Sequence, residues 1–255
     1  MLVRTWNLFH GNSVPRGRTA YLEQMVRFAA ADRPDVLLLQ ELPLWAFAEL
    51  EAWSGMQAFT QVAHRTPLGA TLGGKITQLN PGLLRSAVSG QGNAILLDRS
   101  LEAFDYHALV LNPLGFRTRQ PVGLEAQLAW AKERRILQAV RVRLRNDRRM
   151  LVGNLHATSY RASPALATLE LRRARDFFLA LTQPEEIEVL GGDYNLRTDA
   201  LGFFASAGFS APGRGIDHVF VRGAAATPPE SWPDERRRIA GVLVSDHAPL
   251  EVRIT

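Results

Sequence analysis

Residues 187–195 read IEVLGGDYN, an apolar run that ends on two glycines and passes directly into Asp193 and Asn195. A short apolar run rich in Val, Ile and Leu is typical of a buried strand. The stretch therefore predicts a strand over Ile187–Asp193 with a carboxylate and an amide at its carboxyl end. Side chains at strand ends are held rigidly and can line a cleft.

The same arrangement recurs along the chain: five predicted strands are followed by Asn, Glu, Asp or His at their carboxyl ends. One polar strand end means little, but five of this kind indicate a common site. Besides Asp193 and Asn195, the polar residues at these ends are Asn7, Gln40, Glu41, Asn154, His156, Asp246 and His247.

The remaining periodicity predicts a layered α/β chain that is richer in sheet than a doubly wound fold. No linker of Pro, Gly or Ser divides the sequence, so we expect one domain over residues 1–255. Helices are expected from Thr19 to about Ala31, over about Leu44–Trp53, and from Pro164 to about Leu181, the last with Ser163 as its N-cap. The predicted strands are Leu2–Asn7, Val36–Glu41, Asn93–Leu97, Ile136–Leu144, Met150–His156, Ile187–Asp193, Ile216–Val221 and Ala248–Ile254.

The composition limits the kinds of catalytic and metal sites that the chain can form. The 255 residues contain no cysteine, which excludes disulfides, thiolate metal sites and a Cys nucleophile. A metal would have to be held by Asp, Glu, Asn or His, and oxygen-rich ligation suits Mg²⁺, Mn²⁺ or Ca²⁺. The net charge of +5 is compatible with an anionic substrate. No apolar run is long enough to span a membrane, and the start of the chain lacks the features of a signal peptide, so we expect a cytoplasmic protein.

This inventory of side chains suits the hydrolysis of a phosphate ester. A hard cation held by carboxylates neutralises developing charge and lowers the pKa of bound water. A histidine can act as a general base or donate to phosphate oxygens, and an aspartate behind it fixes its tautomer.

The motifs resemble those of the endonuclease/exonuclease/phosphatase superfamily, which includes DNase I-like and exonuclease III-like enzymes. The similarity extends from residue 5 to residue 250 in the order of the family. The matching segments are Thr5-Trp6-Asn7, Leu39-Gln40-Glu41, residues 92–96, Glu133-Arg134-Arg135, Asn154-Leu155-His156, residues 191–195, residues 215–219 and residues 245–250.

The resemblance implies a DNase I-like four-layer α/β sandwich, with two mixed β-sheets face to face, helices outside, and the active site at one edge. It implies that Glu41 binds the main metal, with Asn7 and Asp246 beside it. It further implies a catalytic group of His156, Asp193, Asn195, Asp217 and His247, with Asp217 paired to His247. Asn93, Arg135 and Asn154 are expected to contact the substrate. Whether His247 or Asp193 activates the water is left open, with His247 favoured.

Three functions compete. The leading one is a phosphodiesterase or phosphatase that acts on a small or lipid-derived phosphate ester, without a protein partner. The second is a DNA or RNA nuclease, for which Arg141, Arg143 and Arg145 could form a basic stripe. The third is a binding module that kept the fold without catalysis, which the complete set of expected catalytic residues disfavours. Specificity is assigned to aromatic and basic residues of two unassigned stretches, Gly55–Gly92 and Leu111–Trp130, among them Phe59, Arg117, Arg119 and Trp130.

Overall fold

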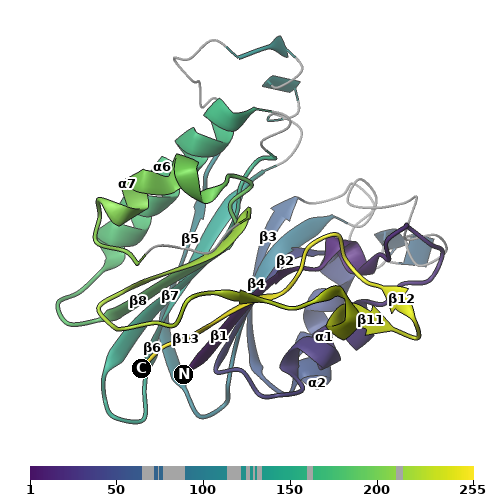
Figure 1. Ribbon diagram of the computed structural model, residues 1–255, viewed down its shortest axis with the longest axis horizontal. Helices are drawn as coiled ribbons and strands as arrows, with labels where there is room; N and C mark the ends of the chain where they lie inside the picture. Colours follow the sequence, from purple (N-terminus) through teal and green to yellow (C-terminus); the bar gives the residue numbers. More distant parts are fainter. Residues whose placement is uncertain are drawn as a thin grey trace.

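Two mixed β-sheets pack face to face in the computed structural model, with helices on both outer surfaces (Figure 1). The structure describes residues 1–64, 72–73, 75–76, 90–113, 122–124, 127–128, 130, 134–159, 163–210 and 215–255. This arrangement confirms the expected four-layer α/β sandwich. Among the described residues, no helix is both long and apolar enough to cross a membrane.

The first sheet has six strands and the second has five. The order in the first is β10 (Glu230–Ser231), β13 (Leu250–Arg253), β1 (Leu2–Asn7), β2 (Val36–Leu42), β4 (Gln91–Leu97) and β3 (Gln57–His64). The order in the second is β5 (Glu102–Val110), β6 (Ile136–Arg143), β7 (Arg149–His156), β8 (Ile187–Asp193) and β9 (Asp217–Arg222). A separate two-stranded ribbon joins β11 (Arg238–Ile239) to β12 (Val242–Leu243).

Because side chains alternate along each strand, each sheet packs one face against the other sheet and the other face against the outer helices. On β2, Val36 and Leu38 join the core between the sheets, whereas Leu37 and Leu39 face the core under the outer helices. The first sheet is covered by α1 (Leu22–Ala30) and α2 (Leu50–Ser54), and the second by α6 (Pro164–Leu181) and α7 (Gly202–Ala205) (Figure 1). Short 3₁₀ turns are η1 (Phe9–Gly11), η2 (Leu44–Ala48), η3 (Thr198–Leu201) and η4 (Asp234–Arg237).

Most predicted elements are present, with changes at their ends. The N-cap is confirmed, since the Ser163 hydroxyl accepts a hydrogen bond from the Leu166 amide at 3.3 Å. The expected helix over Leu44–Trp53 is instead η2 followed by α2, and the first helix begins at Leu22 rather than Thr19. The last strand begins at Leu250, two residues after the predicted start.

Two edge strands escaped the sequence analysis. The strand β5 is largely exposed and carries a register shift between Phe104 and Tyr106, so its apolar alternation is broken. The strand β3 falls within the stretch Gly55–Gly92 that was left without an element. Both strands pair along one side only, which reduces the burial that produces a readable pattern.

Strand register places the polar ends side by side. Parallel pairing of β7 with β8 sets His156 opposite Asp193, and antiparallel pairing of β8 with β9 sets Asp193 opposite Asp217. In the other sheet, parallel pairing of β1 with β2 sets Asn7 beside Gln40. Since β1 also contacts β8, these ends meet at one edge of the sandwich.

Candidate active site

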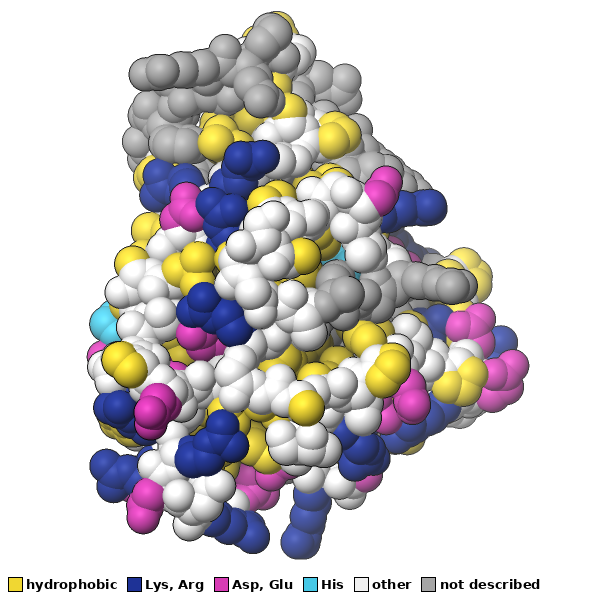
Figure 2. Space-filling model, turned by 60° about the vertical axis from the view of Figure 1, so that its left-hand side comes forward, with side chains coloured by type: hydrophobic (Ala, Val, Ile, Leu, Met, Phe, Trp, Pro, Cys, Tyr) yellow, Lys and Arg dark blue, Asp and Glu magenta, His cyan; other side chains and the backbone are white. Residues whose placement is uncertain are grey.

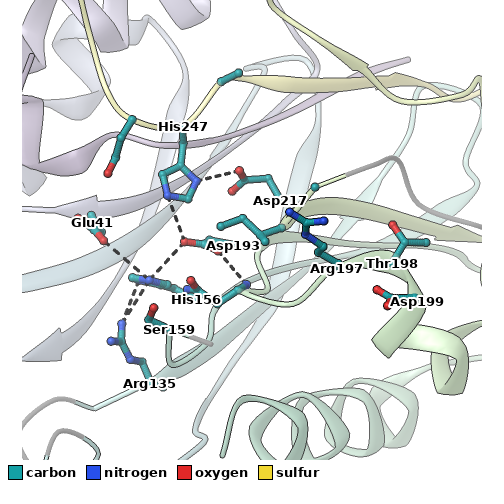
Figure 3. A pocket seen from close by; sticks show the side chains of 15 residues that line it. Glu41, Arg135, His156, Ser159, Asp193, Arg197, Thr198, Asp199, Asp217 and His247 are labelled. Atoms are coloured by element: carbon teal, nitrogen blue, oxygen red, sulfur yellow. Dashed lines mark hydrogen bonds and ion pairs between the residues drawn. The ribbon is translucent and has the colours of Figure 1, made fainter. Parts of the chain in front are cut away.

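A cleft of about 1040 Å³ opens at this edge of the sandwich (Figure 3). Its lining contains most of the polar residues singled out in the sequence, from both sheets. The described residues that line it are Glu41, Arg135, His156, Ser159, Asp193, Asn195, Arg197, Thr198, Asp199, Gly215, Ile216, Asp217, Asp246, His247 and Ala248.

Asp193 lies at the centre of the group. Its Oδ2 accepts a hydrogen bond from the Asn7 amide at 3.0 Å, and its Oδ1 accepts one from the Asn195 backbone at 2.9 Å. The Asn195 side chain in turn donates to the Ala157 carbonyl at 3.0 Å, with its own backbone at a φ of 53°. Asn7 and Asn195 therefore fix the orientation of the Asp193 carboxylate from two sides.

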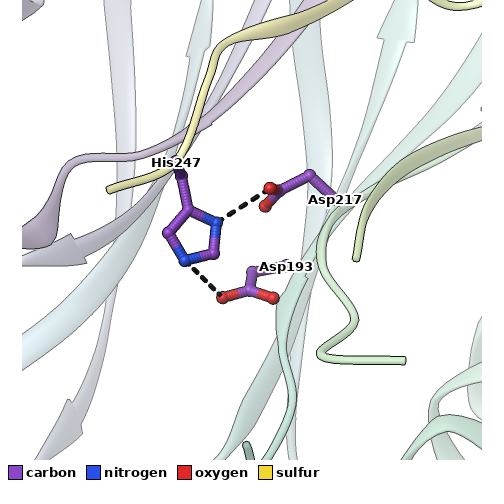
Figure 4. Close-up of side chains that lie close together, drawn as sticks. All are labelled: Asp193, Asp217 and His247. Atoms are coloured by element: carbon purple, nitrogen blue, oxygen red, sulfur yellow. Dashed lines mark hydrogen bonds and ion pairs between the residues drawn. The ribbon is translucent and has the colours of Figure 1, made fainter. Parts of the chain in front are cut away.

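His247 lies between two carboxylates (Figure 4). Its Nδ1 is 2.8 Å from Asp217 Oδ2, and its Nε2 is 3.8 Å from Asp193 Oδ2. Burial lowers the pKa of His247, but attraction to Asp217 and Asp193 outweighs burial and raises it to about 10. Burial raises the pKa of Asp193 to about 7, with Asp217 and Glu41 adding to the rise while His247 opposes it. The pair therefore retains protons that isolated side chains would have lost.

Glu41 and His156 form the opposite wall. The Oε1 of Glu41 is 3.9 Å from His156 Nε2, which is itself 3.5 Å from Asp193 Oδ2. Burial raises the pKa of Glu41, but His10, His156 and His247 together outweigh it and lower the pKa to about 2. Burial and the Arg135 cation lower the pKa of His156 to about 3, so its ring is neutral at pH 7.

Arg135 contacts the ring of His156 directly. Its Nη1 is 3.3 Å from each ring nitrogen, which places the guanidinium beside the ring in the lining of the cleft (Figure 3). Its backbone amide donates to the Asn112 side chain at 2.6 Å, which anchors the start of β6. A cation held in this position can meet an anionic substrate.

The loop that carries His247 is held in place by hydrogen bonds. Trp6 and Ser245 belong to the quoted motifs, whereas Arg237 was not singled out in the sequence. The carbonyl of His247 accepts hydrogen bonds from Trp6 Nε1 and Arg237 Nη1, both at 2.9 Å. The same Arg237 nitrogen lies 3.4 Å from the Val244 carbonyl and 3.1 Å from that of Ser245. The Ser245 hydroxyl joins the loop to β1 by donating to the Asn7 carbonyl at 2.7 Å.

Asp246 and Asn93 lie outside the cluster formed by Asp193, His247, His156 and Glu41. Asp246 lines the cleft and is exposed, whereas its expected neighbours Asn7 and Glu41 are buried and partly buried. Asn93 is buried and outside the lining of the cleft. Its Nδ2 has no hydrogen-bond partner among the described residues.

Asn154 corrects an expectation of substrate contact. It is fully buried, and its Nδ2 donates to the carbonyls of Leu39 at 3.0 Å and Ala94 at 2.8 Å. Its Oδ1 accepts from Gln40 at 2.8 Å. The bulge in β2 between Leu39 and Leu42 interrupts the ladder to β4, and Asn154 satisfies the freed groups. Its amide joins the two sheets and does not face the cleft.

The specificity assignments also change. Phe59 packs against the core between the sheets, and Trp130 is buried against Leu166 with its Nε1 donating to Glu170. Arg117 and Arg119 lie outside the described residues. The cleft instead presents Ser159 and three consecutive residues of the segment after β8, Arg197, Thr198 and Asp199.

The donor set fits a hard divalent cation. One oxygen or nitrogen each of Asp193, Asp217 and His247 lie within 4.8 Å of one another. Because Asp217 and His247 already share a hydrogen bond, the chemistry of that trio suits proton exchange as well as ligation of a cation. Glu41 adds a carboxylate with a low pKa on the other side of Asp193, and carboxylate oxygens are the ligands that Mg²⁺ and Mn²⁺ prefer.

Comparison with known proteins agrees with the family resemblance of the motifs. The sequence model of the Endonuclease/Exonuclease/phosphatase family matches residues 5–247. No curated protein sequence matches the chain. Among solved structures, a functionally unknown conserved protein from Enterococcus faecalis V583 is similar with a TM-score of 0.72 at 16% identity, covering 100% of this chain and 99% of that one.

Two further structures are similar along their whole length. A mannosyl-6-phosphatase from Bacteroides thetaiotaomicron VPI-5482 has a TM-score of 0.66 at 14% identity, covering 100% of this chain and 99% of that one. A humanized D. rerio TDP2 has a TM-score of 0.62 at 14% identity, covering 100% and 98%. At these identities the structural likeness shows the fold.

Proposed function

The chain belongs to the endonuclease/exonuclease/phosphatase family, whose members hydrolyse phosphate esters, and from this premise we propose that it is a divalent-metal-dependent phosphoesterase acting on a small phosphate ester. The observation that carries the proposal is His247, which lies between Asp217 and Asp193 in a cleft faced by Glu41. A binding module without catalysis would have no need of a histidine held between the buried Asp193 and the partly buried Asp217.

In this proposal Glu41 holds the cation, supported by Asn7 and the exposed Asp246. The ion, Mg²⁺ or Mn²⁺, would stabilise the negative charge that develops on the phosphate and make water more acidic. His156 donates to a phosphate oxygen from a neutral ring, and Arg135 contacts the same phosphate group, whereas the buried Asn93 lies outside the lining of the cleft.

His247 exchanges the proton, with Asp217 fixing its tautomer through Nδ1 and leaving Nε2 toward Asp193. Asp193 is the competing base, because burial raises its pKa to about 7, close to the operating range, whereas the pKa of about 10 leaves His247 protonated there in the metal-free protein. The acidic limb of the pH–rate profile separates the two. It should persist in Asp193→Asn if His247 is the base, and persist in His247→Gln if Asp193 is.

The nuclease alternative loses one of its supports. Arg141 does not belong to an exposed basic stripe, because it is buried and its Nε bonds to Glu186 at 2.6 Å. Arg143 pairs with Glu102 at 3.2 Å. Figure 2 shows Lys and Arg side chains scattered among acidic ones on the face it presents. We therefore favour a small substrate, and keep the cytoplasmic location and the absence of a protein partner as parts of the proposal.

The test is turnover by the purified protein with Mg²⁺ or Mn²⁺ on supercoiled plasmid, bis-p-nitrophenyl phosphate and a panel of monoesters that includes hexose 6-phosphates. His247→Ala is the inactive comparison, and His107→Ala on β5 is the matched control. Metal-dependent turnover of a small ester that only His247→Ala loses supports the proposal. Turnover of plasmid alone would transfer the assignment to a nuclease, and the absence of both turnover and metal binding would reject the enzyme.

A further inference from the structure

One buried histidine beside the cleft has no part in the chemistry described so far. His10 is 4% exposed, and its Nε2 is 3.4 Å from Oε2 of Glu41. The other oxygen of the same carboxylate, Oε1, faces His156 at 3.9 Å. The two histidines therefore approach the two oxygens of Glu41 separately.

The backbone around His10 is strained. Phe9, His10 and Gly11 adopt φ values of 50°, 54° and 81°, in the left-handed region that non-glycine residues rarely enter. Two such non-glycine residues in succession are energetically unfavourable. Such conformations persist only where the surroundings enforce them, and they cluster at functional sites.

Several contacts enforce this turn. The Phe9 amide donates to Asn7 Oδ1 at 3.0 Å, and the Asn12 side chain donates to the Phe9 carbonyl at 2.7 Å. A side chain at Gly11 would come within 2.8 Å of Leu22 Cβ, so only glycine allows the turn to pack against the start of α1. The outcome of these constraints is the placement of the His10 ring against Glu41.

The backbone of Glu41 is also in the left-handed region. Its φ is 53°, and it lies in the bulge of β2 between Leu39 and Leu42. A bulge turns a side chain out of the regular alternation of the strand. The side chains of His10 and Glu41 thus meet because two separate segments both leave regular geometry at this point.

We propose that His10 is a positioning residue, which holds Oε2 of Glu41 through its Nε2–H so that Oε1 is presented to the divalent cation. The inference rests on the proposed function, since it assigns the support of the residue proposed to hold the metal. Carboxylates that ligate metals are themselves hydrogen-bonded, and loss of such a partner weakens metal affinity about 10- to 100-fold.

Two amide variants, which differ in how far the side-chain nitrogen extends from the backbone, test this role of His10. His10→Gln carries an amide nitrogen about as far from the backbone as Nε2, whereas the amide of His10→Asn ends short of Glu41. Asn also tolerates a left-handed backbone, so the His10→Asn variant keeps the turn. The readout is Mn²⁺ affinity by calorimetry and by electron paramagnetic resonance, with thermal unfolding in EDTA as a check on folding and His107→Ala as the control histidine.

The proposal expects His10→Asn to bind Mn²⁺ about 10- to 100-fold more weakly than the wild type, and His10→Gln to recover most of that loss. It also expects the Mg²⁺ concentration for half-maximal activity to shift by the same factor in His10→Asn. Equal affinity in His10→Asn and the wild type would overturn the role of His10, as would equal losses in both amide variants. If the wild type itself binds no Mn²⁺, it is the proposed function that fails.

Discussion

His247 Nδ1 lies 2.8 Å from Oδ2 of Asp217, and this contact joins the loop after β12 to the first residue of β9. Asp217 Oδ1 has no hydrogen-bond partner among the described residues, so the carboxylate is committed to His247. An aspartate in this position fixes the histidine tautomer and stabilises its cation.

We predict that Asp217→Asn lowers kcat by about 10²- to 10⁴-fold, the usual contribution of positioned acid–base catalysis. The amide cannot stabilise an imidazolium, although it preserves the shape of the side chain. Steady-state kinetics on the preferred substrate measures the effect. Asp147→Asn, an exposed position in the β6–β7 turn, is the matched control. A loss of less than about threefold in Asp217→Asn would show that the contact is only structural.

The raised pKa of His247 predicts how stability depends on pH in the metal-free protein. Its folded pKa of about 10 is above the ordinary 6.5, so the folded state holds an extra proton between these values. The stabilisation is present in full below pH 6.5 and is lost as the pH rises toward 10. The free energy of unfolding should fall by up to about 1.4 kcal/mol per pH unit in this window.

Urea unfolding in EDTA between pH 7.5 and 9.5 measures this slope. The window lies above the folded pKa of Asp193, about 7, so that group contributes little to the change. His247→Gln should flatten the slope because it removes the titrating ring. An equal slope in the variant would mean that another group holds the proton.

Metal binding should expel a proton from the same group of residues. At pH 6, Asp193 with a pKa of about 7 is largely protonated. A cation held beside it favours the carboxylate, so Mn²⁺ binding should release on the order of one proton. Calorimetry in two buffers of different ionisation enthalpy counts the protons. Asp193→Asn should remove most of the release, and unchanged release in that variant would reject Asp193 as its source.

The sequence indicated which residues meet at the centre of the candidate site because strand register places them side by side. His156, Asp193 and Asp217 lie in one row across β7, β8 and β9, and each ends or begins a buried strand. The GG pair before Asp193 is also informative, since a side chain at Gly192 would meet the Leu155 carbonyl at 2.0 Å. Motifs of this kind report constraints that are local in sequence.

The remaining features depend on contacts between distant segments. Asn154 lies two residues before His156 in β7, yet its amide bonds backbone groups of the other sheet at the bulge of β2. His10 carries no periodic signal, because a left-handed turn and not a strand places it. The sequence marks which residues are polar, but the direction of each side chain is set by bulges and turns that the pattern does not reveal.

Arg237 is the clearest such case and gives the last prediction. It is 6% exposed, and one nitrogen of its guanidinium serves the carbonyls of Val244, Ser245 and His247. Arg237→Lys keeps the charge but loses the planar fork, whose Nη1 bonds these carbonyls while Nη2 bonds Asp234. A displacement of His247 by about 1 Å can cost on the order of 10²-fold in rate.

We therefore expect kcat of Arg237→Lys to fall about 10- to 100-fold while KM changes little, and the pH–rate profile to shift with the altered Asp217 contact. Arg238→Lys is the matched control, because Arg238 is exposed and its side chain bonds the Gly241 carbonyl of its own ribbon at 2.9 Å. If Arg237→Lys unfolds at a lower temperature but keeps the wild-type kcat and pH profile, the guanidinium stabilises the loop without positioning His247.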